Sequence, residues 1–217
     1  MPWFSGKAMA MVEYVSAWLQ GLAQYDQGTY WHSLRTAKYF LRFMDYLGIR
    51  GESAKYICAS AALHDIGKLA IPQHILQKKG KLSRREYHEV KKHPQLAFEW
   101  MSLLRNPDEL VRIPYLHHER WDGSGYPLGL RGTEIPYNVR LFSVIDVWEA
   151  MSVNRPYRAA ISQAAILGYI ARSSGTLFDP EAVDAFLRWR KKTSGDFWAK
   201  LVYPAAREAR KEKRFIL

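Results

Sequence analysis

The chain has 217 residues, 48% of them hydrophobic, and a formal net charge of +11. This length fits one large domain, or a domain with an appendage, and the hydrophobic fraction is enough for a buried core. The charge suits an anionic ligand or an acidic surface, but paired CxxC motifs and RNP sequences are absent, so we expect no nucleic-acid polymer as a partner.

Cysteine content and hydropathy limit the compartment. The single cysteine, Cys58, excludes an internal disulfide, fits a reducing compartment, and is expected to be a small buried hydrophobic residue. No segment reaches the ~18 apolar residues of a membrane span. The N-terminal stretch is interrupted by Lys7 and Glu13 and lacks the shape of a secretory signal. We therefore expect a cytoplasmic protein without a membrane span.

Apolar residues recur at helical spacing nearly throughout, and no alternating strand pattern is present, so we expect an all-α fold. Residues 5–24 predict an amphipathic helix, with packing on the domain as the default role and a dimer contact or the remnant of a connection as alternatives. Thr29 is expected to cap the next helix, which ends near Leu47, and Ser53 to cap the helix that leads to His64 and Asp65.

Further caps and breaks order the second half of the chain. Ser83 and Glu86 predict a capping box, and the short helix that it starts should end at the His93-Pro94 pair, because proline disfavours helical backbone in the residue before it. We expect helices at about 95–105 and 108–119, after Pro136, from Ser162 to Ser173, and from Asp179-Pro180 to Trp189. The Gly/Pro-rich segment from Trp121 to Pro136 predicts a loop that can approach a ligand closely.

Histidines and aspartates recur on or beside these predicted helices. The candidates are His32, His64, Asp65, His93, His117, His118 and Asp146. Taken alone, a His-Asp pair is more often a satisfied histidine beside an acid, because buried polar groups need partners. Imidazole and carboxylate groups without cysteine suit Fe, Mn, Zn and other first-row divalent metals. The remaining histidines, His74 and His88, are expected at the surface.

The order of these residues resembles the HD superfamily of metal-dependent phosphohydrolases. Residues 117–127, with the sequence HHERWDGSGYP, resemble the signature of its HD-GYP branch, and Arg155-Pro-Tyr-Arg158 resembles the arginine motif of that branch. The resemblance runs from about Asp26 to about Phe186. It implies a single helical HD-GYP catalytic domain over 26–190, with an N-terminal helix over 1–25 and a basic extension over 191–217.

The resemblance implies a centre of two divalent metal ions. The expected ligands of one ion are His32, His64 and Asp146; those of the other are His93, His117 and His118, with Asp65 shared. Iron or manganese is expected, with Zn, Ni, Co and Mg as options. Because adjacent helical residues point about 100° apart, His117 and His118 can both ligate only at a distorted helix end. Gly28 stands where some members carry a glutamate that supports a third metal, so we expect two.

The implied activity is hydrolysis of cyclic di-GMP to linear pGpG, with GMP as an optional further product, by attack of a metal-bridging hydroxide. By the resemblance, Asp65 and Lys68 are catalytic, Lys68 contacts the scissile phosphate, and Tyr126, Arg155 and Arg158 bind substrate. Residue types alone leave other roles open: Lys68 as a solvated lysine at a helix end, the two arginines as helix caps, and Tyr126 as a packed loop residue.

Two other functions stay open at this point. One is an HD phosphohydrolase for another cyclic dinucleotide or a nucleotide, and the other is a non-catalytic module that senses the dinucleotide. Diguanylate cyclase, other signalling proteins and a second copy of the chain are optional partners. Glu149 and Ser152 depart from the aspartate and threonine expected in the helix of Asp146.

Overall fold

The computed structural model describes residues 6–103, 107–153 and 160–193. This part of the chain contains helices and no strand, as the sequence predicted. Its elements are α1 (Gly6–Tyr25), α2 (Gln27–Tyr46), α3 (Glu52–Ala62), the 3-10 helix η1 (Ile66–Ala70), α4 (Gln73–Leu76), α5 (Arg84–Val90), α6 (His93–Leu103), α7 (Asp108–Leu116), the 3-10 helix η2 (Gly132–Glu134), α8 (Tyr137–Ser152), α9 (Gln163–Arg172) and α10 (Pro180–Thr193). None of these helices is long and apolar enough to cross a membrane.

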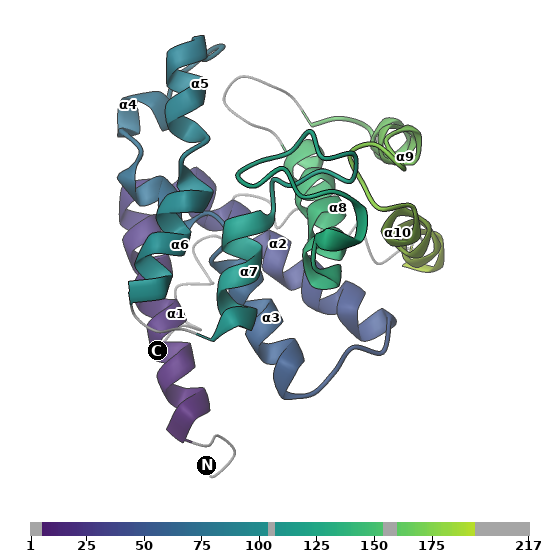
Figure 1. Ribbon diagram of the computed structural model, residues 1–217, viewed down its shortest axis with the longest axis horizontal. Coiled ribbons are helices and arrows are strands. Elements are labelled where there is room, and N and C mark those ends of the chain that lie inside the picture. The colour runs from purple at the N-terminus through teal and green to yellow at the C-terminus, as the bar shows by residue number, and fades with distance from the viewer. Residues whose placement is uncertain (1–5, 104–106, 154–159, 194–217) are drawn as a thin grey trace, which may run out of the picture.

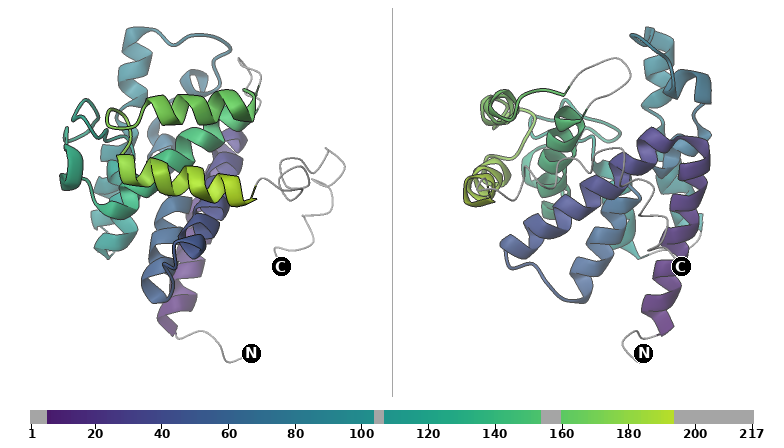
Figure 2. Two further views of the ribbon diagram at one scale, coloured as in Figure 1. Left: turned by 90° about the vertical axis from the view of Figure 1, so that its right-hand side faces the viewer. Right: turned by 180° about the vertical axis from the view of Figure 1, so that it is seen from behind.

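Helix α2 is the element that the two sides of the bundle share. On one side it packs against α1 and α3, and α3 leads through α7 to α6 and η1 (Figure 1). On the other side α2 packs against α8, which α9 and α10 cover from outside (Figure 2). The roles offered for α1 include packing, and α1 does contact α2, α3 and η1. The division at residues 25 and 190 stays a prediction.

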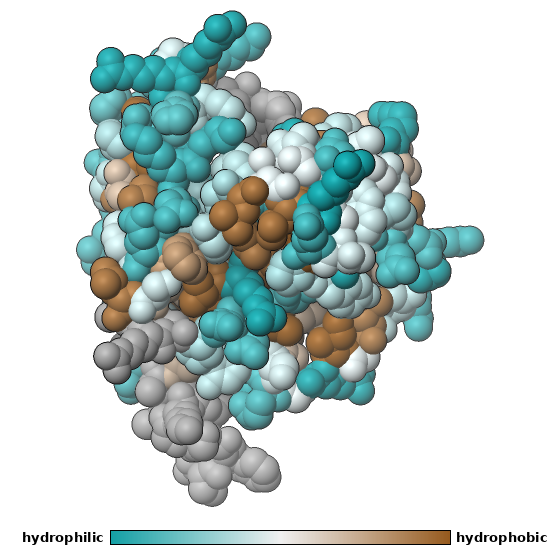
Figure 3. All heavy atoms as spheres, in the orientation of Figure 1, coloured by the Kyte–Doolittle hydropathy of each residue, from teal (hydrophilic) through white to brown (hydrophobic). Residues whose placement is uncertain are grey.

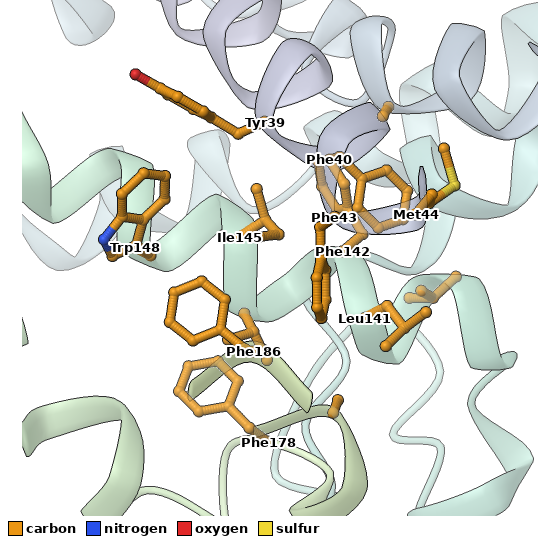
Figure 4. Close-up of a cluster of buried hydrophobic side chains, with 14 of the residues drawn as sticks. Tyr39, Phe40, Phe43, Met44, Leu141, Phe142, Ile145, Trp148, Phe178 and Phe186 are labelled. Atoms are coloured by element: carbon orange, nitrogen blue, oxygen red, sulfur yellow. The ribbon is translucent and has the colours of Figure 1, made fainter. Parts of the chain in front are cut away.

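Aromatic side chains fix α8 against α2 and α10 (Figure 4). The rings of Phe40 and Phe142 meet edge to face at 5.3 Å, and Trp148 and Phe186 lie 6.0 Å apart. All four side chains are at most 1% exposed. Burial of such a side chain contributes roughly 1.5–3 kcal/mol, so this contact sets the position of α8 opposite α2 firmly.

A second, smaller apolar cluster joins η1, α6 and α7. Its buried members are Leu63, Ile66, Ala97, Met101, Leu110 and Val111. Leu63 and Ile66 flank the His64-Asp65 pair in the sequence, so the cluster holds this turn against α6 and the first turn of α7.

Several helix starts differ from the sequence predictions. Helix α2 is capped by Asp26 rather than Thr29, since the Asp26 carboxylate accepts the Thr29 N–H at 3.1 Å. Helix α3 starts after Gly51, whose φ of 89° only glycine adopts readily, and Ser53 lies inside the helix. The prediction of a Ser53 cap was wrong because glycine itself serves at this helix start.

Other local predictions are confirmed or shifted by a few residues. The Ser83–Glu86 capping box and the Ser162 cap are both present. The short helix that was expected to end at His93-Pro94 ends earlier, at Val90, and His93 instead begins α6. Histidines His74 and His88 are exposed, as predicted. Cys58 is partly buried, and burial raises the pKa of its thiol to about 11.

Candidate metal centre and substrate site

Most candidate side chains come from the ends of helices. His64 and Asp65 lie in the turn between α3 and η1, and His93 is the first residue of α6. Helix α7 ends at Leu116, so His117 is its C-cap and His118 lies beyond it. The chain therefore leaves the helical path where two adjacent imidazoles need to face one centre, and their ring centroids lie 4.0 Å apart.

The first group of ligating atoms belongs to His32, His64 and Asp65, and these atoms lie within 4.8 Å of one another. Asp146 of α8 faces this group. Its Oδ1 atom is 2.9 Å from Nε2 of His32 and 3.7 Å from Nε2 of His64. Four predicted residues thus meet at one point, although α2 and α8 lie far apart in the sequence.

The second group comprises His93, His117 and His118, again with ligating atoms within 4.8 Å. The Nε2 atoms of His93 and His117 are 3.2 Å apart. Asp65 lies between the two groups: its Oδ2 atom is 3.3 Å from Nε2 of His64, and its Oδ1 atom is 3.3 Å from Nε2 of His93. A 2% exposed carboxylate with one oxygen toward each group is placed to bridge two cations.

Backbone carbonyls orient three of the rings through Nδ1. The contacts are His64 Nδ1 to Ala61 O at 2.9 Å, His93 Nδ1 to Val90 O at 2.7 Å, and His117 Nδ1 to Ile113 O at 3.0 Å. A carbonyl oxygen only accepts, so Nδ1 carries the hydrogen and donates it. Each Nε2 atom then presents a lone pair to the centre, as a metal ligand must.

The fourth oriented ring is that of His32, which bonds through Nδ1 to Glu149 Oε2. Glu149 is 1% exposed and also pairs with Nε of Arg35. Burial alone would raise the pKa of Glu149, but His32 and Arg35 outweigh this effect and lower it. A carboxylate behind a ligating imidazole makes the imidazole more basic and fixes its orientation.

Burial and charge divide the histidines into two electrostatic classes. Burial lowers the pKa of His93 to about 3 and that of His117 to about 4, so both are neutral near pH 7. Burial also acts to lower the pKa of His32, but the Asp146 and Glu149 carboxylates outweigh it and raise that pKa to about 9. The side of the centre next to α2 and α8 therefore has the more negative electrostatic potential.

Asp65 stays ionised in this setting. Burial would raise its pKa, but Lys68, His64 and His93 hold the pKa well below its usual range. The Lys68 ammonium donates to Oδ2 of Asp65 at 2.7 Å. A cation thus lies beside the carboxylate that faces both histidine groups.

The donor set fits two first-row divalent cations. Two imidazole lone pairs 3.2 Å apart repel each other unless a cation or a proton lies between them, and this is the separation at His93 and His117. The buried Oδ1 atom of Asp146 has no hydrogen bond of good geometry among the described residues, although Nε2 of His32 is close. Nitrogen and carboxylate ligands without thiolate favour Mn, Fe, Co, Ni and Zn.

The loop after His118 closes one wall of the centre. The Tyr126 ring stacks on the His118 ring at 4.7 Å and 25°, and the Tyr126 N–H donates to the His118 carbonyl at 3.2 Å. A Cβ atom at Gly125 would lie 2.6 Å from that carbonyl, so only glycine fits there. The loop therefore holds Tyr126 directly against a candidate ligand, and its role in substrate binding stays a prediction.

Glu119 fastens this loop. Its carboxylate accepts the N–H groups of Leu128, Gly129 and Leu130 at 2.7, 3.1 and 3.0 Å, and the residue is 4% exposed. The predicted substrate residues Arg155 and Arg158 lie outside the described residues.

Comparison with known proteins agrees with this geometry. A family model described as an HD domain matches residues 11–182. The chain belongs to the HD domain family. The HD domain is 43% identical over 150 residues to the cyclic di-GMP phosphodiesterase response regulator RpfG of Xanthomonas campestris, covering 67% of this chain and 39% of that protein. It is 37% identical over 177 residues to a cyclic di-GMP phosphodiesterase of Thermotoga maritima, covering 80% and 48%.

The chain thus spans less than half the length of these two curated relatives. Among solved structures, it resembles the Vibrio cholerae cyclic GMP-AMP-specific phosphodiesterase V-cGAP3, with a TM-score of 0.63 and 14% identity over 94% of this chain and 53% of that one. At this identity the likeness concerns the fold alone.

Sequence reasoning about the HD domain gave no role to Glu119, and it treated Glu149 only as a departure from a pattern. Glu149 lies three residues after Asp146, on the same helical face, which is a signal that could have identified it. For Glu119 no such signal exists, because its partners depend on how the following loop folds back.

Proposed function

We propose that this HD domain is a metal-dependent phosphodiesterase that hydrolyses a cyclic dinucleotide, with cyclic di-GMP as the first candidate. The observation that carries the proposal is the Asp65 carboxylate, which directs one oxygen to each of two histidine groups and has a lysine beside it. The names of the curated relatives support the substrate class.

In this proposal His32, His64 and Asp146 would hold one ion, His93, His117 and His118 would hold the other, and Asp65 would be shared between them. Iron or manganese is our choice of metal, since the ligands are nitrogen and carboxylate oxygen. Two divalent cations held here lower the pKa of bound water and stabilise negative charge on a phosphodiester. We infer two ions rather than three, because Gly28 has no side chain to ligate another.

Three further groups act on the substrate in this proposal. Lys68, which donates to Asp65, would contact the scissile phosphate and balance the charge on it. Tyr126 borders the bound dinucleotide from its place on His118. Arg155 and Arg158 are proposed to grip phosphate oxygens through their planar guanidinium groups.

The proposal favours cyclic di-GMP over cyclic GMP-AMP because both curated relatives described above carry the former in their names. Linear pGpG is the proposed main product, because we infer that a third ion, for which Gly28 offers no ligand, would favour the further cleavage to GMP.

One experiment tests the function. The protein is purified under reducing conditions, its metal content is measured per chain, and turnover of cyclic di-GMP is assayed with Mn²⁺ and with Fe²⁺ beside an Asp65→Ala variant. We expect about two ions per chain and turnover that the variant lacks. Cyclic GMP-AMP and mononucleotides are assayed in parallel.

The other functions give different results in the same assay. Turnover of mononucleotides alone would identify an HD phosphohydrolase of another class. Binding of cyclic di-GMP without turnover, at full metal content, would identify a sensing module.

A further inference from the structure

We propose that helix α5 forms an outer wall of the substrate site, where Lys91 binds the second phosphate of the cyclic dinucleotide and Tyr87 stacks on one of its bases. This inference rests on the proposed function and adds a specificity-determining surface to it. Neither residue belongs to the candidate metal ligands or to the loop motif.

The position of Lys91 connects α5 to the centre. Its ammonium lies over the Tyr126 ring, 4.3 Å from the ring centroid, and the same ring stacks on His118. Lys91 also precedes His93 by two residues, at the junction of α5 and α6. A chain of direct contacts therefore runs from a candidate metal ligand through Tyr126 to this ammonium group.

Lys91 is a partly buried cation without a carboxylate partner among the residues that the structure describes. Its neighbours differ: Lys78 pairs with Glu86 at 2.6 Å, and Lys92 pairs with Glu89 at 2.7 Å. The tyrosine ring holds the Lys91 ammonium by cation–π attraction, which leaves its N–H groups able to donate to an anion.

Tyr87 lies one helical turn before Lys91, so the two side chains share a face of α5. The Lys91 N–H donates to the Tyr87 carbonyl at 3.0 Å, which keeps this turn regular. The Tyr87 side chain is 52% exposed, although the surface of the α4–α5 region is mainly hydrophilic (Figure 3). An exposed ring beside an unpaired cation suits a base that is joined to a phosphate.

The chemistry of the substrate has a place for such a wall. A cyclic dinucleotide has two phosphodiesters on opposite sides of its ring, and the candidate metal centre with Lys68 can take only one of them. Lys68, which lies 2.7 Å from Asp65, is already assigned to the scissile phosphate in the proposed function. The second phosphate needs a cation at some distance from the metals. The stacked rings of Tyr126 and His118 separate Lys91 from the candidate metal centre.

The test compares Lys91→Met, Lys91→Arg and the control Lys92→Met, all in the full chain loaded with Mn²⁺. Two substrates are used: cyclic di-GMP, and bis(p-nitrophenyl) phosphate, which has one phosphodiester and no second phosphate. For cyclic di-GMP we expect Lys91→Met to raise KM about tenfold with a smaller change in kcat, because one charge-assisted hydrogen bond is lost. Lys91→Arg should restore most of the affinity, and Lys92→Met should match the unaltered chain.

The factor by which Lys91→Met lowers kcat/KM should be at least fivefold larger for cyclic di-GMP than for bis(p-nitrophenyl) phosphate. A Tyr87→Ser variant should likewise raise KM for cyclic di-GMP, by about fivefold or more, since base stacking is lost. Metal content, measured on every variant, should stay at the unaltered level.

Three outcomes overturn the inference. Lys91→Met could behave like Lys92→Met, or it could impair both substrates equally, which would mean that Lys91 only supports Tyr126. In the third outcome the unaltered chain hydrolyses the small ester and no cyclic dinucleotide, which refutes the proposed function and this inference with it. The first two are measured on variants and the third on the unaltered protein, so the failures are distinguishable.

Discussion

The two ring nitrogens of each oriented histidine serve different purposes. Nδ1 is bonded to a fixed acceptor of the fold, and Nε2 faces the other candidate ligands. At His32 the acceptor is the buried Glu149 carboxylate rather than a carbonyl, so this ring depends on a charge that a single substitution can remove.

We expect Glu149→Gln to weaken metal binding by about 10–100-fold, because an amide neither fixes the His32 ring nor balances Arg35 as a carboxylate does. Calorimetric titration of the metal-free protein with Mn²⁺ measures the effect. Glu89→Gln, which removes only a surface pair with Lys92, is the matched control. Equal Mn²⁺ affinity in both variants would show that Glu149 has no part in the centre.

Gly67 is a second position where one residue decides the geometry. A Cβ atom there would lie 1.9 Å from the carbonyl oxygen of His93, so Gly67→Ala must push η1 away from α6. We expect a loss of about 1–3 kcal/mol in unfolding free energy, together with weaker metal binding. Urea unfolding measures the first effect.

The control for this variant is Gly21→Ala in α1, where the nearest atom would be 3.9 Å away. An alanine inside a helix should stabilise it by about 0.5–1 kcal/mol. If Gly67→Ala proved as stable as Gly21→Ala, the close approach of η1 and α6 would be refuted.

At the scale of elements, the loop after α7 is held by one side chain rather than by secondary structure. Glu119 accepts three consecutive N–H groups, and the loop in turn holds Tyr126 on His118. The local order of this wall therefore depends on a carboxylate that also directly follows the two adjacent histidines.

We expect Glu119→Gln to cost about 1–3 kcal/mol, because the amide NH₂ group faces backbone donors and leaves at least one of them unsatisfied. Amide hydrogen exchange at Leu128, Gly129 and Leu130 should become faster, while exchange in α2 stays slow. Glu134→Gln, at an exposed position that accepts the Arg131 N–H, is the control. Unchanged exchange in the Glu119 variant would contradict the role of Glu119 as the fastener.

Helix ends mark the limit of prediction from the sequence. Ser83 with Glu86 is a two-residue signal and located the start of α5 correctly, whereas Asp26 and Thr29 can each cap a helix and lie three residues apart. Local chemistry does not choose between them. The end of α7 was predicted near residue 119 and lies at Leu116, although ligation by both His117 and His118 was expected to need a distorted helix end.

At the scale of the molecule, convergence of the candidate ligands followed from the resemblance and not from spacing. The contact between His32 and Glu149 joins residues 117 positions apart, and nothing in the local sequence of α2 or α8 indicates it. Packing of Phe40 on Phe142 produces it, by fixing the two helices side by side. The residue types could be predicted, but the partners of each imidazole could not.

This convergence predicts that metal ions stabilise the whole fold. Side chains from α2, from the turn after α3, from α6 and α8 and from the end of α7 meet at buried or partly buried positions, and their lone pairs repel one another when no cation is bound. A ligand at a thousandfold excess over its Kd adds about 4 kcal/mol, and a chain of this size gains about 2–4 °C in Tm for each kcal/mol. We expect Mn²⁺ to raise the Tm of the chelator-treated protein by roughly 10 °C.

Asp65→Asn should lose most of this shift, because it removes the bridging charge, whereas Asp45→Asn at an exposed surface pair should keep it. Calorimetric scans of the three proteins with and without Mn²⁺ decide the matter: a Tm that does not respond to metal in the unaltered chain would mean that these side chains form no common centre.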